Sequence, residues 1–359
     1  MRQNRRMIVG HINAKIPRWS SNVGKSITLV SPKATKDLDH GRHTKAFFRA
    51  IAMLLWFFLQ SLFFQMAMGI SEAADTEIKR FFRMGDGEIR ICNVHNGLEA
   101  NVQLLKHDGS LNEGALIALD KVFGLPQGDR GEHVSSRLIF LLDYFSDKVA
   151  PGRIIELHSG YRDPAYNQKL RSSGGNVALT STHMDAMAID FSIKGVAGKE
   201  LWETIRKEEC CGVGYYGGDV VHLDSGRPRF WEAATSKVNS GESKFNGRIY
   251  LSTQYDRYKP GENVHLTLSS VSDYPFGVRR AIGIVKEGLT DEDGAIVGQI
   301  GADDECISVS DRAGGRSLYA PLPQDLPAGR YRIRVEFCRI PFPQMPTGIV
   351  SNPVEVVRE

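Results

Sequence analysis

Two short stretches with alternating side chains constrain the fold of this chain more than any other feature. Residues 187–193 alternate large apolar with small or polar side chains, so a strand there places Asp190 on its polar face. Residues 220–224 also read as a strand, which places His222 and Asp224 on one face. If these two strands are neighbours, Asp190 and His222 converge, and His183 can join them from the preceding loop. We therefore expect a half-buried strand at 187–193 beside a strand at 220–224.

Two histidines and one aspartate form a set of three ligands that suits Zn²⁺ and leaves a fourth position open. A catalytic zinc needs such a position, because a bound water must lose its proton near neutral pH. Taken singly, each residue is more often a core histidine or a turn aspartate. Their types and spacing together favour a metal site with the ligands His183, Asp190 and His222.

Four motifs around these residues resemble the zinc D-Ala-D-Ala peptidase family of bacterial cell-wall enzymes. They are Ser159-Gly160-Tyr161-Arg162, His183 to Asp190, Gly212-Val213-Gly214-Tyr215-Tyr216 and Val221-His222-Leu223-Asp224. The pattern fits the murein endopeptidase K-like branch and covers about residues 80–232. It departs from that branch at Ala186, where glycine is usual. Alanine would strain a backbone that is held at positive φ.

The resemblance implies a zinc-dependent peptidase that hydrolyses the peptide cross-links of peptidoglycan, with stem peptides as substrate. A D-alanyl carboxypeptidase of the same family is the alternative activity. A non-catalytic protein that binds the cell wall is a rival from another functional class. The intact ligand set together with Arg162 argues against this rival.

The resemblance also assigns a role to Arg162, which would bind the developing oxyanion or a substrate carboxylate. A planar guanidinium suits both tasks, whereas an arbitrary arginine more often forms a surface ion pair. His158 lies nearby and is expected to be structural rather than a fourth ligand.

The sequence leaves open whether the general base is Asp219, Asp224 or neither of them. Asp219 stands three residues before His222, where much of the wider family has an acidic residue. Strict alternation would turn it away from His222, but Gly217-Gly218 indicate a turn in which alternation does not apply. Asp224 shares the face of His222, and orienting that ligand is its alternative role.

Residues 50–70 are the only apolar run of membrane-spanning length. The arm before it, residues 1–49, is rich in Lys and Arg against only Asp37 and Asp39, which favours retention of the arm in the cytoplasm. Ser71-Glu72-Ala73 suits signal cleavage after Ala73. An uncleaved inner-membrane anchor and a buried helix are the alternatives. Cleaved signal and anchor both place the remaining chain in the periplasm or elsewhere outside the cytoplasm.

Charge and cysteine content add two constraints. Much of the formal net charge of +3 comes from the basic arm, so composition gives no case for nucleic-acid binding. Cys306 and Cys338 either pair in an oxidising compartment or remain buried thiols. The adjacent Cys210 and Cys211 do not have a zinc-binding spacing, and we assign them to packing.

The remaining patterns predict two folded domains, joined by a linker at residues 233–246. Residues 77–232 form an α+β peptidase domain in which helices back a small antiparallel sheet. Helical spacing predicts helices near 112–124, 134–145, 164–172 and 198–209, and Asn96-Gly97 predicts a hairpin. Residues 247–359 show short alternating runs separated by turns, as in an immunoglobulin-like β-sandwich, which we expect to position the enzyme on the wall or a partner.

Overall fold

The computed structural model describes residues 79–126, 133–175, 177–236, 244–288, 295–299 and 306–358. All of the described residues belong to the compact unit that spans residues 73–359. The predictions for the arm at 1–49, the apolar run at 50–70 and cleavage after Ala73 fall outside the described residues. No helix within the described ranges is long and apolar enough to cross a membrane.

The first part of the described chain is built on a seven-stranded sheet with the order β2-β1-β3-β4-β6-β5-β7. Its strands are β1 (Glu88–Asn93), β2 (Glu99–Gln103), β3 (Ile155–Ser159), β4 (Ala188–Ile193), β5 (Gly212–Tyr215), β6 (Val221–Asp224) and β7 (Arg229–Glu232). The predicted hairpin joins β1 to β2, with Gly97 at φ 70°. The expectation of a small antiparallel sheet is wrong in part, because β1 pairs with β3 and β5 with β7 in parallel. The long connection through two helices returns β3 alongside β1 in the same direction.

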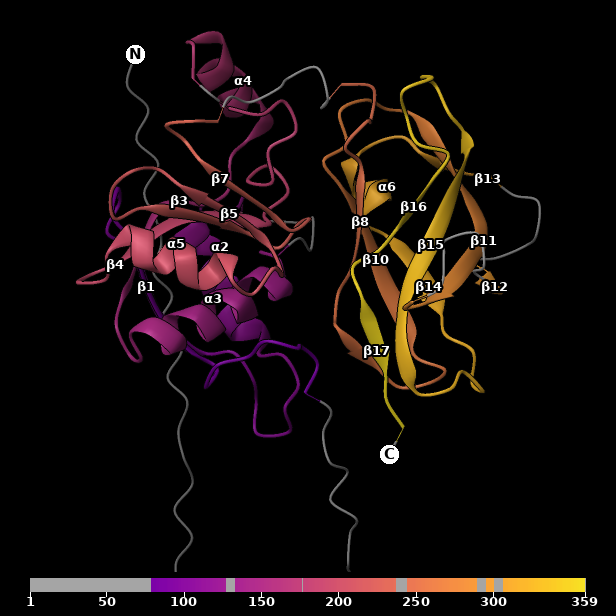
Figure 1. Cartoon of the computed structure of the whole chain (residues 1–359), viewed down its shortest axis with the longest axis horizontal. Helices are drawn as coiled ribbons and strands as arrows, with labels where there is room; N and C mark the ends of the chain where they lie inside the picture. Colours follow the sequence, from indigo (N-terminus) through magenta and orange to yellow (C-terminus); the bar gives the residue numbers. More distant parts are fainter. Residues whose placement is uncertain are drawn as a thin grey trace, which may run out of the picture. The chain divides into compact units, whose positions relative to one another are not determined.

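Four helices complete this part at the predicted places: α2 (Glu113–Phe123), α3 (Ser136–Val149), α4 (Pro164–Ser172) and α5 (Gly198–Arg206). Figure 1 shows α2, α3 and α5 together on one side of the sheet. The apolar spacing of α3 buries Leu138, Leu142 and Phe145 in the core against the sheet. Ser135 caps α3, and its hydroxyl accepts a hydrogen bond from the amide of Leu138.

Strand β4 is buried along its whole length, so the prediction of a half-buried strand is wrong. It lies in the middle of the sheet between β3 and β6, and both of its faces are covered. Asp190 therefore occupies a buried position that is only 6% exposed. A carboxylate in such a place needs charged or hydrogen-bonding partners.

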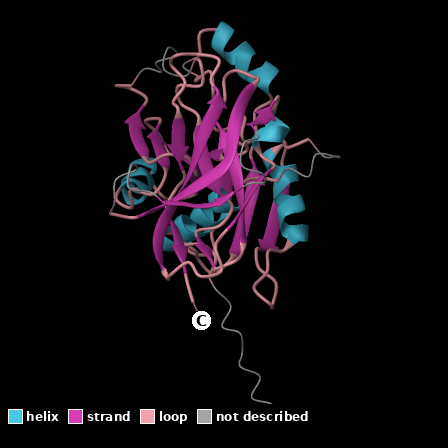
Figure 2. Cartoon of the chain, turned by 90° about the vertical axis from the view of Figure 1, so that its right-hand side faces the viewer, coloured by secondary structure: helices cyan, strands magenta, loops and turns pink. Residues whose placement is uncertain are grey.

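In the second part, which we call the C-terminal β region (residues 247–358), the described regular elements are strands joined by loops, apart from the short helix α6 (Figure 2). One sheet has the order β14-β10-β8 and the other β12-β11-β15-β17-β9, with β13 on β11 and β16 on β15. The bounds are β8 (Tyr250–Thr253), β9 (Arg257–Tyr258), β10 (Asn263–Ser269), β11 (Phe276–Lys286), β12 (Ala295–Gln299), β13 (Cys306–Val309), α6 (Arg312–Gly315), β14 (Leu318–Pro321), β15 (Gly329–Arg339), β16 (Gly348–Val350) and β17 (Val354–Val356).

Both sheets of the C-terminal β region contribute to one apolar core, which includes Leu266 of β10 and Ile333 of β15. The predicted β architecture is confirmed, whereas its immunoglobulin-like type stays a prediction. Cys306 and Cys338 form a disulfide, as one of the two sequence readings expected. Cys210 and Cys211 form a disulfide as well, which the sequence did not predict, and both pack at the apolar core as expected.

Three carboxylates, those of Asp86, Asp143 and Asp147, gather where the segment before β1 meets α3. Asp143 accepts hydrogen bonds from the amides of Gly85 and Gly87 at 2.8 and 3.1 Å. Burial, together with the neighbouring charge of Asp147 and against these two hydrogen bonds, raises the pKa of Asp143 from 3.8 to about 7. An acid whose pKa is higher in the folded state loses its stabilising effect as the pH rises through that value.

We therefore expect the stability of the protein to fall between about pH 4 and pH 7, as Asp143 ionises beside Asp147. Asp147→Asn removes one of the like charges and should raise the melting temperature at pH 8 by roughly 1–4 °C. Near pH 4 the gain should disappear, because Asp143 then holds its proton and no longer repels Asp147. Thermal unfolding at the two pH values measures this, and an equal gain at both would show that packing rather than charge is responsible.

Candidate metal centre

Asp190 and His222 meet because β4 and β6 are paired in the register that sets these two residues directly opposite one another. His183 approaches from the loop before β4, as predicted. Backbone hydrogen bonds within this loop, from Ala186 to the carbonyl of His183 and from Met187 to that of Thr182, fold it into consecutive turns. The three side chains are all buried and form a cluster able to hold a metal ion.

The spacing of the three ligand atoms fits a zinc ion. His183 Nε2 lies 3.2 Å from His222 Nδ1 and 3.3 Å from Asp190 Oδ1, and His222 Nδ1 lies 2.9 Å from Asp190 Oδ1. Tetrahedral bonds of about 2.0–2.1 Å to zinc place neighbouring ligand atoms about 3.3 Å apart. The protein thus holds the three atoms close to the separations that a zinc ion requires.

Hydrogen bonds on the far sides of the two imidazoles fix which nitrogens carry protons. His183 Nδ1 lies 2.7 Å from the carbonyl oxygen of Gly160, and His222 Nε2 lies 2.8 Å from Asp224 Oδ2. Both oxygens accept hydrogen bonds, so these nitrogens donate, and a ring in its neutral form turns the lone pair of its other nitrogen towards the centre. Two nitrogen lone pairs and a carboxylate oxygen therefore face one another, an arrangement that a cation stabilises.

The protonation states of the side chains in the centre also favour binding of a metal cation. Burial by itself would raise the pKa of Asp190, but the two histidines hold the pKa of this carboxyl well below its ordinary value. Burial lowers the pKa of His183 and favours the neutral ring that a metal needs. At His222 burial lowers the pKa, but the hydrogen bonds to Asp190 and Asp224 outweigh it and raise the pKa. The centre thus combines an ionised carboxylate with a neutral imidazole at His183.

Ala186 has a positive φ angle, the backbone conformation that was expected because glycine is usual at this position in the family. Its φ angle is 51°, in the left-handed region that disfavours side chains, and the residue is only 1% exposed. The strain of such a position is about 1 kcal/mol for a residue with a Cβ. The surrounding loop maintains it, since the carbonyl of Ala186 accepts a hydrogen bond from the amide of Ser135.

Arg162 lies at the centre and does not form a surface ion pair. Its Nη2 contacts Asp190 Oδ2 at 2.8 Å, and its Nε donates to Ser159 Oγ at 3.0 Å. The guanidinium therefore holds the carboxylate oxygen that faces away from the histidines. Its side chain is 15% exposed, so part of it reaches the solvent-filled space around the centre.

Asp224 supports His222 from behind. It is fully buried, and Arg229 donates to both of its oxygens, at 2.6 and 3.1 Å. Burial alone would raise the pKa of Asp224, but Arg229 and His222 lower it to about 2. The carboxylate is thus ionised and can orient the ring of His222.

Two glycines of the Gly-Val-Gly-Tyr-Tyr motif make room for this support. A Cβ on Gly212 would lie 2.2 Å from Asp224 Oδ2, and one on Gly214 would lie 2.3 Å from the indole of Trp231. That indole packs on the ring of His222 with centroids 4.9 Å apart. Glycine at these two places allows the close packing that holds the histidine ligand.

Two further predicted residues are not brought to the centre. Asp219 is exposed in the turn between β5 and β6, and it is not among the described residues that line the cleft around the metal ligands. The turn itself was expected from Gly217-Gly218. His158 hydrogen-bonds through Nε2 to Ser192 Oγ at 2.9 Å, outside the ligand cluster, in keeping with a structural role.

The ligands open into a cleft of about 1310 Å³. Residues before position 234 supply one part of its lining, including Arg162, Tyr216 and Trp231. Residues from 244 onwards supply another part, namely Lys244, Gly247, Arg248, Tyr250, Ser270 and Gln344. A cleft of this size can hold an extended peptide of several residues.

The comparisons with known proteins agree with this geometry. The family model described as peptidoglycan L,D-endopeptidase MepK matches residues 84–231. This segment belongs to the MepK-like peptidase family. The match contains the three ligands, Arg162 and nearly all of the mixed sheet, and it ends before the C-terminal β region.

Two relatives illustrate how far the similarity extends. Peptidoglycan L,D-endopeptidase MepK of Escherichia coli (strain K12) is 28% identical over 144 residues, which cover 40% of this chain and 79% of the relative. A probable peptidoglycan L,D-endopeptidase MepK of Haemophilus influenzae is 35% identical over 79 residues, which cover 22% of this chain and 42% of that protein. No solved structure matches the chain.

The MepK-like region also contains a functional candidate that the sequence analysis did not single out. Tyr216 donates its hydroxyl to Asp190 Oδ1 at 2.9 Å. The residue is 44% exposed, but loss of solvent around its hydroxyl and the charge of Asp190 raise its pKa, so the phenol stays protonated and acts as a donor. Strand alternation could have identified it. Gly214 lies opposite His222, and Tyr216, two residues later, is expected on the same face of the sheet.

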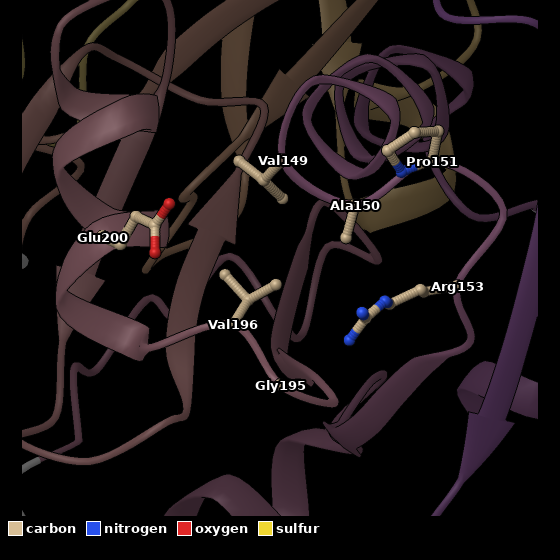
Figure 3. Close-up of a pocket in the computed structure, with 7 residues that line it drawn as sticks. All are labelled: Val149, Ala150, Pro151, Arg153, Gly195, Val196 and Glu200. Atoms are coloured by element: carbon tan, nitrogen blue, oxygen red, sulfur yellow. The ribbon is translucent and has the colours of Figure 1, made fainter.

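Figure 3 shows another pocket, which has a volume of about 380 Å³. Its lining residues are Val149, Ala150, Pro151, Arg153, Gly195, Val196 and Glu200. They include one carboxylate and no histidine or cysteine, which does not suit a metal. The catalytic candidates therefore lie around the larger cleft.

Proposed function

We propose that the chain is a zinc-dependent peptidase that hydrolyses peptide cross-links of peptidoglycan. The observation that carries this proposal is the convergence of three metal-binding atoms from His183, Asp190 and His222 at zinc spacing. The MepK-like family match supports peptidoglycan as the substrate. The cleft beside the ligands provides space for a peptide.

The residues around the ligands have separate tasks in this proposal. A zinc ion supplies a Lewis acid that activates water and polarises a carbonyl group. Arg162 and Tyr216 orient Asp190 through its two oxygens, and both are donors that can stabilise negative charge developing on the scissile carbonyl. Asp224 keeps the proton of His222 on Nε2, which leaves Nδ1 for the metal.

The assignment of the general base is tested by two substitutions. If Asp219 is the base, Asp219→Ala should keep zinc near one per chain while turnover falls by about 10²–10⁴-fold. If Asp224 orients His222, Asp224→Ala should weaken zinc affinity by roughly 10–100-fold and lower turnover through that loss. Zinc content and cleavage rate are measured for both proteins. Full activity of Asp219→Ala would exclude Asp219, and zinc retention without cleavage in Asp224→Ala would make Asp224 the base.

Incubation of the purified protein with isolated peptidoglycan, with and without a chelator, tests the activity. We expect products of cross-link cleavage by mass spectrometry, and their loss with the chelator. Release of D-alanine without cleavage of cross-links would identify the carboxypeptidase instead. Sedimentation with the wall without any product would favour the non-catalytic binder.

We further propose that the enzyme acts in the periplasm or elsewhere outside the inner membrane, with residues 50–70 as a signal peptide or anchor. The basic arm before this run resists translocation. A reporter fused after Glu359 should therefore be active only outside the cytoplasm, and gel mobility should separate cleavage after Ala73 from a retained anchor. Activity of this fusion in the cytoplasm would contradict the proposed location.

A further inference from the structure

Charged contacts fix the C-terminal β region to the MepK-like region. Arg137 of α3 forms an ion pair with Asp256, and the two side chains are only 14% and 7% exposed. The guanidinium of Arg80 bonds both oxygens of Glu262 at 2.7 Å each. Because paired and hydrogen-bonded charges hold their partners in a specific geometry, the two regions meet in a defined way.

One contact between the regions lies in the loop that carries the ligand His183. Asp185 stands two residues after this ligand, and its Oδ2 accepts a hydrogen bond from the amide of Ser270 at 2.9 Å. Arg316, which directly follows the short helix α6, donates through Nη2 to the carbonyl oxygen of Asp185 at 2.6 Å. The C-terminal β region therefore holds both the side chain and the backbone of this loop residue.

The charge of Asp185 is also compensated from the C-terminal β region. Its Oδ1 lies 3.5 Å from Nη2 of Arg316 and 3.9 Å from Nη2 of Arg312. The side chains of Asp185 and Arg316 are each only 12% exposed. Removal of the nearer cation would leave this shielded carboxylate poorly compensated, which is unfavourable. The two arginines therefore favour the loop conformation that presents Asp185 to them.

Helix α6 also contacts the segment that fixes the ring of His183. The guanidinium of Arg312 stands 5.8 Å from the centre of the Tyr161 ring, within the range of cation–π attraction. Gly160, the neighbour of Tyr161, accepts the hydrogen bond from His183 Nδ1 at 2.7 Å. Arg312 and Arg316 thus reach both of the segments that position His183, namely its own loop and the segment before α4.

The loop needs contacts from outside because part of its backbone is strained. Ala186 follows Asp185 directly and has a φ angle of 51° although it carries a Cβ. Such a conformation persists only where the surrounding structure fixes it. The amide of Ser135 holds the carbonyl oxygen of Ala186 at 2.9 Å from within the MepK-like region, and the contacts on Asp185 hold the preceding residue from the C-terminal β region.

We propose that the C-terminal β region is a positioning element for the metal centre, which holds the loop of His183 in the metal-binding conformation through Ser270 and Arg316. This role rests on the proposed zinc peptidase and adds to it an intramolecular contribution to metal affinity. Arg316 acts through Asp185, so it is a positioning residue and not a catalytic one. Both Ser270 and Arg316 lie outside the family match, which ends at residue 231.

The zinc affinity of the full chain, measured by competition with a chromophoric chelator, tests this role without relying on turnover. Arg316→Ala removes the donor to the carbonyl oxygen of Asp185. It should weaken zinc binding by roughly 10-fold, the lower end of what loss of support for a metal ligand costs. Arg316→Lys keeps a cation and a donor and should restore part of the affinity. Asp185→Asn keeps the shape of the side chain without its charge, and it should weaken zinc binding by less than Arg316→Ala.

Arg80→Ala is the matched control, because it breaks another ion pair between the same two regions, and neither Arg80 nor Glu262 is among the described residues that line the cleft. It should leave zinc affinity unchanged. Unchanged zinc affinity in both Arg316→Ala and Asp185→Asn would overturn the positioning role. An equal loss in Arg80→Ala would overturn it too, because any weakening of the contact between the regions would then have the same effect.

Amide hydrogen exchange of the chelator-treated protein gives a second readout that needs no metal. The amides of residues 184–187 bond carbonyl oxygens within the loop, and in Arg316→Ala they should exchange roughly 10-fold faster, because the loop opens more readily. Unchanged exchange would contradict the positioning role. Cleavage of peptidoglycan is assayed separately. Weaker zinc binding and faster exchange in Arg316→Ala, without cleavage by the unaltered protein, would support the positioning role and refute the proposed peptidase.

Discussion

Replacement of His183, Asp190 or His222 by alanine is expected to remove zinc from the protein and to abolish cleavage of cross-links. Each substitution leaves two protein ligands, and catalytic zinc sites use three. The ligand atoms lie 2.9–3.3 Å apart within a buried cluster. No other described acidic or histidine side chain belongs to this cluster, so none is in place to substitute for a lost ligand. We expect zinc per chain to fall from about one to near zero, and turnover to fall below detection.

His158→Ala provides the control for these variants. His158 is close in sequence and partly buried, but it bonds Ser192 and stays outside the ligand cluster. Its replacement should leave zinc content unchanged. The metals bound by all four variants are measured by elemental analysis, beside cleavage of isolated peptidoglycan. If the three ligand variants retained both zinc and activity, the assignment of this centre would be refuted.

The second large effect is expected at Arg162. Arg162→Ala removes a donor to Asp190 Oδ2 and, in the proposed mechanism, a donor to the developing oxyanion. Loss of one such donor lowers turnover by about 10²–10³-fold. Loss of support for a metal ligand weakens metal affinity by roughly 10–100-fold. We therefore expect both effects, and saturating zinc should restore only the second.

Arg162→Lys separates charge from geometry, because lysine keeps the positive charge but lacks the planar fork. It should recover zinc affinity more fully than turnover. Arg90→Ala is the control, since Arg90 pairs with Glu88 on the exposed face of β1 and should be silent. Normal turnover of Arg162→Ala in saturating zinc would show that this arginine only orients Asp190.

The candidate metal ligands could be predicted from sequence because local periodicity determines which side chains share a face of a strand. Alternation in β4 and β6 placed Asp190 and His222 correctly before their pairing was known. The complete burial of β4 could not be read in the same way. It depends on β3 and β6 on either side and on what covers each face, which are contacts distant in sequence.

Residues in turns and at contacts between regions were harder to predict. Asp219 lies in a turn, where alternation gives no direction, and its family position alone suggested the base. The role of residues such as Ser270 and Arg248 in the cleft was not foreseen, because they follow the linker and belong to another set of sheets. Alternating runs separated by turns predicted those sheets, but this pattern carries no information about which surface the sheets present to the peptidase region.

Ser270 and Arg316 donate hydrogen bonds to Asp185, and these bonds matter for any attempt to isolate the catalytic part of the molecule. A fragment that ends at residue 231 would contain all three ligands, yet Arg137 would lose its acidic partner and the ligand loop would lose an external brace. Relatives that lack such a brace must stabilise their loop by contacts of their own. A chimaera that exchanges the catalytic regions of these proteins would therefore need to include both the loop that bears His183 and the residues that stabilise this loop.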